Sequence, residues 1–253
     1  GLTTGLSTNS LPPNLTDLLY RNSPKASCDG DPRFAALTAI PTFITQSALD
    51  TLFNMTEAVD NYKCYKALGG DVRLFIKPQG HVSGEHDRCG AIERNAATLG
   101  FFNEKLKLQS GAFSAPEVCI HLNSNDGIAL NTLPVANTPV TVDTQTFNIV
   151  GGIGPDITVP LFTSSATDGN ILAGVATANL TVSATAGTPI LFLSLAHQPA
   201  GSATWTVIMD QFRPIKGAGT FNIDLIGVAK RMALGDKIGL RISTQSNPQY
   251  TGH

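Results

Sequence analysis

Two short stretches decide the fold of the first half of the chain: Thr42-Phe-Ile-Thr-Gln-Ser-Ala48 and Asp71-Val-Arg-Leu-Phe-Ile76. Both are rich in β-branched and aromatic residues, which predicts strands. Asp50 follows the first stretch, and His81 follows the second. Each expected strand therefore ends shortly before a residue that can take part in acid-base chemistry.

The segments after these strands have the periodicity of helices. Gly69-Gly70 ends the first helix, whose expected apolar face is Phe53, Met55, Val59, Tyr62, Tyr65 and Leu68. A second helix is expected to run through Ile92, Ala96, Leu99, Phe102 and Leu106. Strand, helix, strand and helix in this order predict parallel strands of an α/β sheet. Two parallel strands alone do not make a stable covered sheet, so we expect further strands from other sequence.

The first 40 residues are irregular, because prolines recur at 12, 13, 24 and 32. The segment from Leu15 to Tyr20 is a candidate helix. Two interpretations stay open for this region: the end of a lid or cap over an active site, or a loop packed on the sheet.

The second half of the chain has the pattern of a β-sandwich. Short apolar or alternating runs are separated by turns such as Asn125-Asp-Gly127 and Asp168-Gly-Asn170. The expected strands are Val118 to Leu122, Val140 to Val142, Phe147 to Val150, Ala178 to Val182, Ile190 to Leu195, Trp205 to Met209, Phe221 to Val228 and Lys237 to Ile242. We therefore expect two domains, an α/β part over residues 1–115 and a β-sandwich over residues 116–253.

Asp50 and His81 are the candidate catalytic residues. They have the chain order Asp, then His, that ends the Ser, Asp, His sequence of α/β-hydrolase triads. Asp50 is also placed where a helix N-cap would be, which is the alternative structural role. No Gly-x-Ser-x-Gly nucleophile motif occurs in the 253 residues. The serine is therefore expected outside this chain.

Other candidates carry weaker signals. His86 lies between Glu85 and Asp87, but adjacent residues seldom bind one ion, so we expect a solvated loop and no metal. His121 and His197 are expected to be packed or surface histidines. No cofactor is expected.

Four cysteines, at positions 28, 64, 89 and 119, permit three pairings, or four free thiols. A bridge from Cys89 would brace the loop after His81. Sequons at Asn14, Asn54 and Asn179 and the 14% of charged residues fit an extracytoplasmic or secreted protein. The first residues lack the features of a signal peptide, although one could precede them.

Composition excludes some partners. A net charge of -2 gives no electrostatic reason to expect nucleic acid or an anionic membrane as partner. No apolar stretch approaches the ~20 residues that span a bilayer.

The order of these segments resembles Xaa-Pro dipeptidyl-peptidase and cocaine-esterase-like serine hydrolases. The stretches that carry the resemblance are Gln46-Ser-Ala-Leu-Asp-Thr-Leu-Phe53, Val72 to His81, Phe101-Phe-Asn-Glu-Lys-Leu106, Gly174 to Val182, Phe221 to Ala229 and Leu234 to Ser243. The resemblance implies the C-terminal portion of an α/β-hydrolase domain followed by a jelly-roll-like sandwich. Asp50 would be the triad acid and His81 the base.

Two functions follow as hypotheses. The first is a serine hydrolase that cleaves peptide (Xaa-Pro type) or ester bonds, whose expected partner is the N-terminal part of the same hydrolase carrying the serine. The alternative is a non-catalytic β-sandwich module for binding, adhesion or assembly. Sandwich edges can pair between subunits, so a homo-oligomer is a further expectation.

Overall fold

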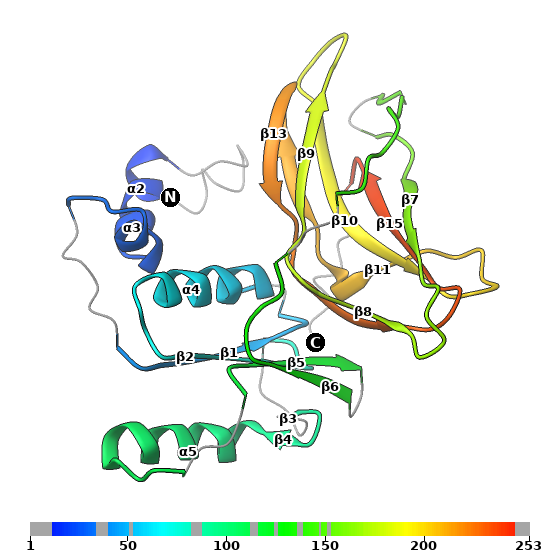
Figure 1. Ribbon diagram of the computed structural model, residues 1–253. Coiled ribbons are helices and arrows are strands. Elements are labelled where there is room, and N and C mark those ends of the chain that lie inside the picture. Colours follow the sequence, from blue (N-terminus) through cyan, green and yellow to red (C-terminus); the bar gives the residue numbers. More distant parts are fainter. Residues whose placement is uncertain are drawn as a thin grey trace.

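The chain is mostly β with few helices, and its sheets form two adjoining parts (Figure 1). The computed structural model describes residues 12–33, 40–50, 53–81, 88–111, 116–123, 126–135, 139–146, 148–150 and 153–245. Among these residues, no helix has the length and the apolar character that a membrane span needs.

The first part is built on a four-stranded sheet. Its strands follow the spatial order β1 (Thr42–Ser47), β2 (Val72–Lys77), β5 (Val118–Asn123) and β6 (Asp126–Leu130). β2 pairs in parallel with both β1 and β5, and β6 is antiparallel to β5. The parallel pairing predicted for the first two strands is confirmed.

The position of β5 corrects one expectation, because this strand was predicted to begin the sandwich. It instead pairs with β2. Val118 and Ile120 are completely buried, because β5 lies inside a parallel sheet that is covered on both faces. A short apolar run fits either type of sheet, so periodicity could not decide between them. Because β5 and β6 extend the first sheet, we propose a domain boundary after Leu130 in place of 115.

Two helices cover opposite faces of this sheet (Figure 1). Helix α4 (Met55–Ala67) is capped by Asn54, whose side chain accepts a hydrogen bond from the Thr56 N–H at 3.0 Å. Its buried face includes Met55, Val59 and Tyr62, as predicted. Phe53 was expected on this face, but it precedes the helix and is 56% exposed.

Helix α5 (Arg94–Lys107) forms in the predicted segment, although Ile92 lies outside it. Ala97 and Phe101, four residues apart, contact the core, while Leu99, Phe102 and Leu106 are exposed. The helix carries apolar residues on more than one face, so the sequence pattern predicted a helix but did not determine which face is buried.

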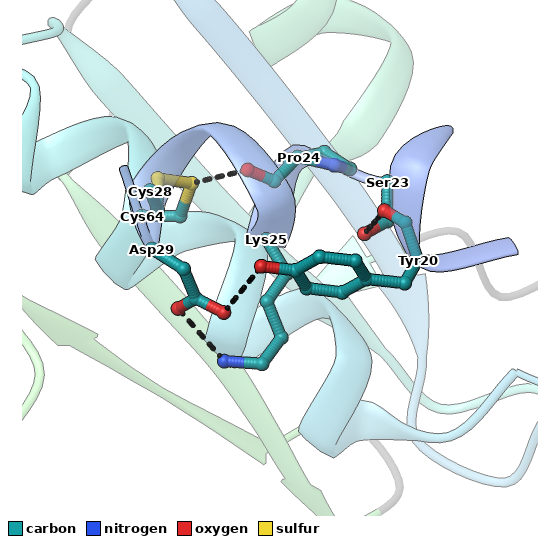
Figure 2. Close-up of a disulfide and its surroundings, with 7 residues drawn as sticks. All are labelled: Tyr20, Ser23, Pro24, Lys25, Cys28, Asp29 and Cys64. Carbon is teal, nitrogen blue, oxygen red and sulfur yellow. Dashed lines mark hydrogen bonds and ion pairs between the residues drawn. A yellow bond between two sulfur atoms is a disulfide. The ribbon is translucent and has the colours of Figure 1, made fainter. Parts of the chain in front are cut away.

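The N-terminal region forms two short helices, α2 (Pro13–Arg21) and α3 (Pro24–Cys28), and the first includes the predicted helix. A disulfide between Cys28 and Cys64 fastens α3 to α4 (Figure 2). Asp29 accepts hydrogen bonds from the Tyr20 hydroxyl at 3.1 Å and from Lys25 at 3.0 Å. The described residues 12–33 of this region therefore pack against α4.

The second disulfide joins Cys89 to Cys119 and settles the pairing that the sequence left open. Cys89 ends β3 (Arg88–Cys89), which forms a small hairpin with β4 (Ile92–Glu93), and Cys119 lies in β5. This bridge fastens the segment that follows the His81 loop to the centre of the first sheet.

The second part is a β-sandwich. One layer holds β11 (Thr206–Val207), β10 (Ile190–Gln198), β15 (Lys237–Ser243), β7 (Ile157–Thr163) and β12 (Arg213–Lys216). The other layer holds the antiparallel pairs β9 (Thr177–Val182) with β13 (Gly219–Asp224) and β8 (Asn170–Gly174) with β14 (Val228–Met232). Apolar residues from both layers, among them Leu193, Val228 and Ile238, form the core between them.

Four predicted strands differ in detail. Residues 140–142 form no strand, and Val150 makes only an isolated bridge with Ile153. The run from Phe221 to Val228 is divided into β13 and β14. The alternation predicted from Trp205 to Met209 ends at Ile208, which is buried because the chain turns there into the short 3-10 helix η1 (Ile208–Asp210).

The two parts share apolar contacts. Ala229 of β14 is 1% exposed and belongs to the core of the first part. Met209 packs against both cores. An ion pair between Arg231 and Asp126 joins β14 to β6, with Nε and Oδ2 2.5 Å apart. The sandwich is therefore packed directly on the first sheet.

Candidate active site

The register of β1 and β2 explains how Asp50 and His81 come together. The strands are parallel, with Ser47 paired with Lys77 at their carboxyl ends. Beyond these ends, the Ala48 N–H donates to the Lys77 carbonyl at 2.8 Å and the Leu49 N–H to the Gln79 carbonyl at 3.0 Å. Residues just past this point meet at the same edge of the sheet, which is the usual place for functional groups in α/β folds.

Asp50 and His81 are in direct contact at this edge. The His81 Nδ1 lies 3.0 Å from the Asp50 Oδ2, while the Asp50 Oδ1 accepts a hydrogen bond from the Phe53 N–H at 2.9 Å. Asp50 is 6% exposed, and the His81 side chain is 51% exposed. The Phe53 ring lies beside the imidazole, with ring centroids 5.7 Å apart. The pair thus combines a buried carboxylate with an accessible imidazole.

The alternative role of Asp50 as a helix N-cap does not fit this geometry. The cap of α4 is Asn54, and the helix begins at Met55. The Asp50 carboxylate instead makes two other contacts: it accepts the Phe53 N–H in the segment between β1 and the helix, and it contacts the ring of His81.

The contact fixes the chemistry that the imidazole can perform. An ionised carboxylate only accepts hydrogen bonds, so the proton of the neutral ring is on Nδ1 and the lone pair is on Nε2. The carboxylate also stabilises the imidazolium that forms when Nε2 takes up a proton. This arrangement can serve as a general base that is oriented by a buried acid.

The nucleophile is not part of this arrangement. Within the described ranges, no serine hydroxyl forms a hydrogen bond with His81. Among the described residues, His81 therefore contacts an acid and no nucleophile.

A residue that the sequence did not indicate also contacts Asp50. The Gln211 Nε2 donates a hydrogen bond to the Asp50 backbone carbonyl at 2.8 Å, across 161 residues of sequence. Gln211 follows η1 in the sandwich and is 7% exposed. No local motif could have found it, because the contact depends on how the two parts of the chain pack.

The other histidines have structural surroundings. The His197 Nε2 lies 2.9 Å from the Asp236 Oδ2 inside the sandwich, and His121 is buried in β5. Glu85, His86 and Asp87 lie outside the described residues. Where the structure describes the chain, no three potential ligands among His, Cys, Asp and Glu gather around a metal site.

Comparisons with known proteins give matches in structure. No family model matches the sequence. No curated protein matches it either. An aminopeptidase from a marine sediment archaeon (Thaumarchaeota archaeon) matches with a TM-score of 0.57 and 11% identity, over 82% of this chain and 48% of that one. The chain shares its fold with hydrolases.

Two further solved structures agree. An α-amino acid ester hydrolase matches with a TM-score of 0.54 and 11% identity, over 89% of this chain and 50% of its own. A CocE/NonD family hydrolase from Staphylococcus aureus matches with a TM-score of 0.51 and 10% identity, over 83% of this chain and 48% of that one. This chain thus spans about half the length of each of these proteins. The matches support a hydrolase-type resemblance in fold, and none of the names mentions an Xaa-Pro specificity.

Proposed function

We propose that this chain is the C-terminal portion of a serine hydrolase and supplies the acid and the base of its Ser–His–Asp triad. One observation carries the proposal: the 3.0 Å contact between a buried Asp50 and an accessible His81 at the carboxyl ends of two parallel strands. The nucleophilic serine and the donors of the oxyanion hole belong, in this proposal, to another part of the same protein.

The reaction follows from the roles of the two residues. The His81 Nε2 takes the proton of the serine hydroxyl while the oxygen attacks the substrate carbonyl carbon. The imidazolium then gives that proton to the leaving alcohol or amine, and an acyl-serine remains. Water attacks the acyl group with His81 again as base, which releases the acid and restores the serine. Asp50 orients the ring and stays ionised throughout.

Peptide bonds of the Xaa-Pro type or ester bonds are the proposed substrates. Names of the structural neighbours include an aminopeptidase and an ester hydrolase, and both kinds of bond are cleaved by acyl transfer. Hydrolysis of Gly-Pro-p-nitroanilide and of p-nitrophenyl acetate by the whole protein separates the two classes.

The triad proposal is tested by labelling the whole protein with a fluorophosphonate probe, which reacts with activated serines. Asp50→Asn and His81→Ala are each expected to slow labelling by about 10³-fold or more, because neither variant retains an oriented base. Mass spectrometry of the labelled peptide then locates the serine.

The chain offers a matched control for this experiment. His197 and Asp236 form a second pair with a similar contact distance of 2.9 Å, but inside the sandwich. His197→Ala and Asp236→Asn are expected to leave the labelling rate unchanged at temperatures where the variants are folded. Labelling that proceeds at the wild-type rate in Asp50→Asn and His81→Ala would refute the proposal and favour a non-catalytic sandwich module.

We also propose that the protein works in an extracytoplasmic or secreted location. All four cysteines pair in two disulfides, which persist in oxidising compartments and are rare in the cytosol. Cell fractionation followed by thiol labelling checks this proposal, since a reduced cytosolic protein would react at all four cysteines.

A further inference from the structure

Gln211 is the polar side chain through which the sandwich reaches the candidate active site. It is 7% exposed, and its Nε2 donates to the Asp50 carbonyl oxygen at 2.8 Å. A buried carbonyl without a donor is costly, so this bond satisfies a group that water does not reach easily. The residue therefore holds the peptide of Asp50 and not its carboxylate.

The backbone before Gln211 is strained. Met209 has φ 63° and Asp210 has φ 50°, which is the left-handed region that residues other than glycine seldom adopt. The segment is kept in this conformation by packing, because Ile208 is buried in the sandwich core and Met209 contacts both cores.

Three contacts of Asp50 together fix its position. The Oδ2 meets the His81 Nδ1 at 3.0 Å, the Oδ1 accepts the Phe53 N–H at 2.9 Å, and the carbonyl oxygen accepts from Gln211. The first two contacts come from the same sheet edge, and the third comes from the sandwich. Rotation of the Asp50 peptide would move the carboxylate relative to the imidazole, and a displacement of about 1 Å can cost 10²-fold in rate.

We propose that Gln211 is a positioning residue of the Asp50–His81 pair, so that the sandwich takes part in assembling the catalytic geometry. The inference rests on the proposed hydrolase function and extends it: the pair reaches its working distance only when the sandwich is packed on the first sheet.

Thr56 offers a control at the same interface. Its hydroxyl donates to the Leu225 carbonyl at 3.2 Å and accepts the Gly227 N–H at 2.8 Å, so it also joins α4 to the sandwich. None of these bonds involves Asp50 or His81. Thr56→Val should weaken the interface without changing the orientation of the acid.

The experiment compares Gln211→Met, Gln211→Asn and Thr56→Val in the whole protein with p-nitrophenyl acetate as substrate. Rates are divided by the serine sites that a fluorophosphonate titrates to completion, so unfolded molecules do not count. Both Gln211 variants are expected to lower kcat about tenfold or more with KM changed less than about twofold, because they affect orientation and not substrate binding. Thr56→Val is expected to keep the wild-type kcat while lowering the unfolding temperature.

Two results would overturn the inference. Wild-type kcat in folded Gln211→Met or Gln211→Asn would show that the bond to Asp50 is only structural, and an equal loss of kcat in Thr56→Val would show that any weakening of the interface has the same effect. Failure of the hydrolase proposal is recognised separately, since the wild-type protein would then not react with the probe or would not depend on Asp50.

Discussion

Two His–Asp pairs lie among the residues that the structure describes, and their surroundings distinguish their roles. His81 is half-exposed at the edge of a sheet, whereas the side chain of His197 is only 12% exposed. Asp236 also accepts the N–H groups of Ala200 and Ala233, each at 2.9 Å, so it ties together two turns of the sandwich. The first His–Asp pair thus forms the candidate site, and the second stabilises the turns of the sandwich.

The pKa of Asp236 leads to a prediction about stability. Burial raises the pKa of this carboxyl, but the hydrogen bonds from His197 and from the Ala200 and Ala233 N–H groups outweigh burial and hold it below its usual value. A lowered pKa in the folded state means that the carboxylate stabilises the fold above its unfolded pKa of about 3.9, and that this stabilisation is lost as pH falls through the folded value.

Asp236→Asn is therefore expected to lower the free energy of unfolding by about 3 kcal/mol at pH 7, because the buried donors lose a charged acceptor. The difference from the wild type should decrease as the pH falls below about 4. Urea denaturation of both proteins across this pH range measures it. A difference that is the same at pH 7 and pH 3 would contradict this explanation.

At the scale of elements, two disulfides close loops of similar length in different places. Cys28 and Cys64 are 36 residues apart and fasten α3 to α4, away from the sheet edge that holds His81. Cys89 and Cys119 are 30 residues apart, and they fasten the hairpin of β3 and β4 to β5. Because β5 is the neighbour of β2, the second bridge lies in the part of the fold that carries His81.

The two bridges should thus differ in their effect on activity but not much in their effect on stability. Removing either pair by double substitution to serine is expected to cost about 2–4 kcal/mol, since the loops are of similar size. Only Cys89→Ser with Cys119→Ser should also lower the rate of fluorophosphonate labelling in the folded protein. Thermal unfolding and labelling rates check the two effects, and a larger loss of labelling in the Cys28 and Cys64 variant would be inconsistent with this geometry.

At the scale of the whole molecule, the two parts are joined by packed apolar residues and by an ion pair. Ala229 of β14 lies in the core of the first sheet, and Arg231 of the same strand pairs with Asp126 of β6. Each part has its own core in addition. Such shared burial should couple the unfolding of the two parts.

Ala229→Leu tests this coupling. The side chain is 1% exposed, so three added carbons would overpack the contact and cost about 1–3 kcal/mol. Calorimetry is expected to show one transition, shifted down by several degrees as a whole. Two transitions, of which only one shifts, would indicate that the parts unfold independently.

Part of this fold could be predicted from local sequence patterns. The apolar runs before Asp50 and His81 predicted β1 and β2, and glycines marked the end of α4. The buried face of α5 could not be predicted, because Leu99, Phe102 and Leu106 have the correct spacing for a core face and yet are exposed. β5 was assigned to the wrong sheet for a similar reason, since a short buried strand has the same composition in either environment.

The sequence by itself determined β1, β2 and the helix that follows each of them, and it showed which acid and which imidazole come after these strands. These properties depend on residues close together in the chain. The pairing of the cysteines, the membership of β5 and the bond from Gln211 to Asp50 were decided only by the tertiary structure. The physical reason is that burial, and a hydrogen bond between residues 161 positions apart, depend on how distant elements pack together. The spacing of neighbouring residues in the sequence does not contain this information.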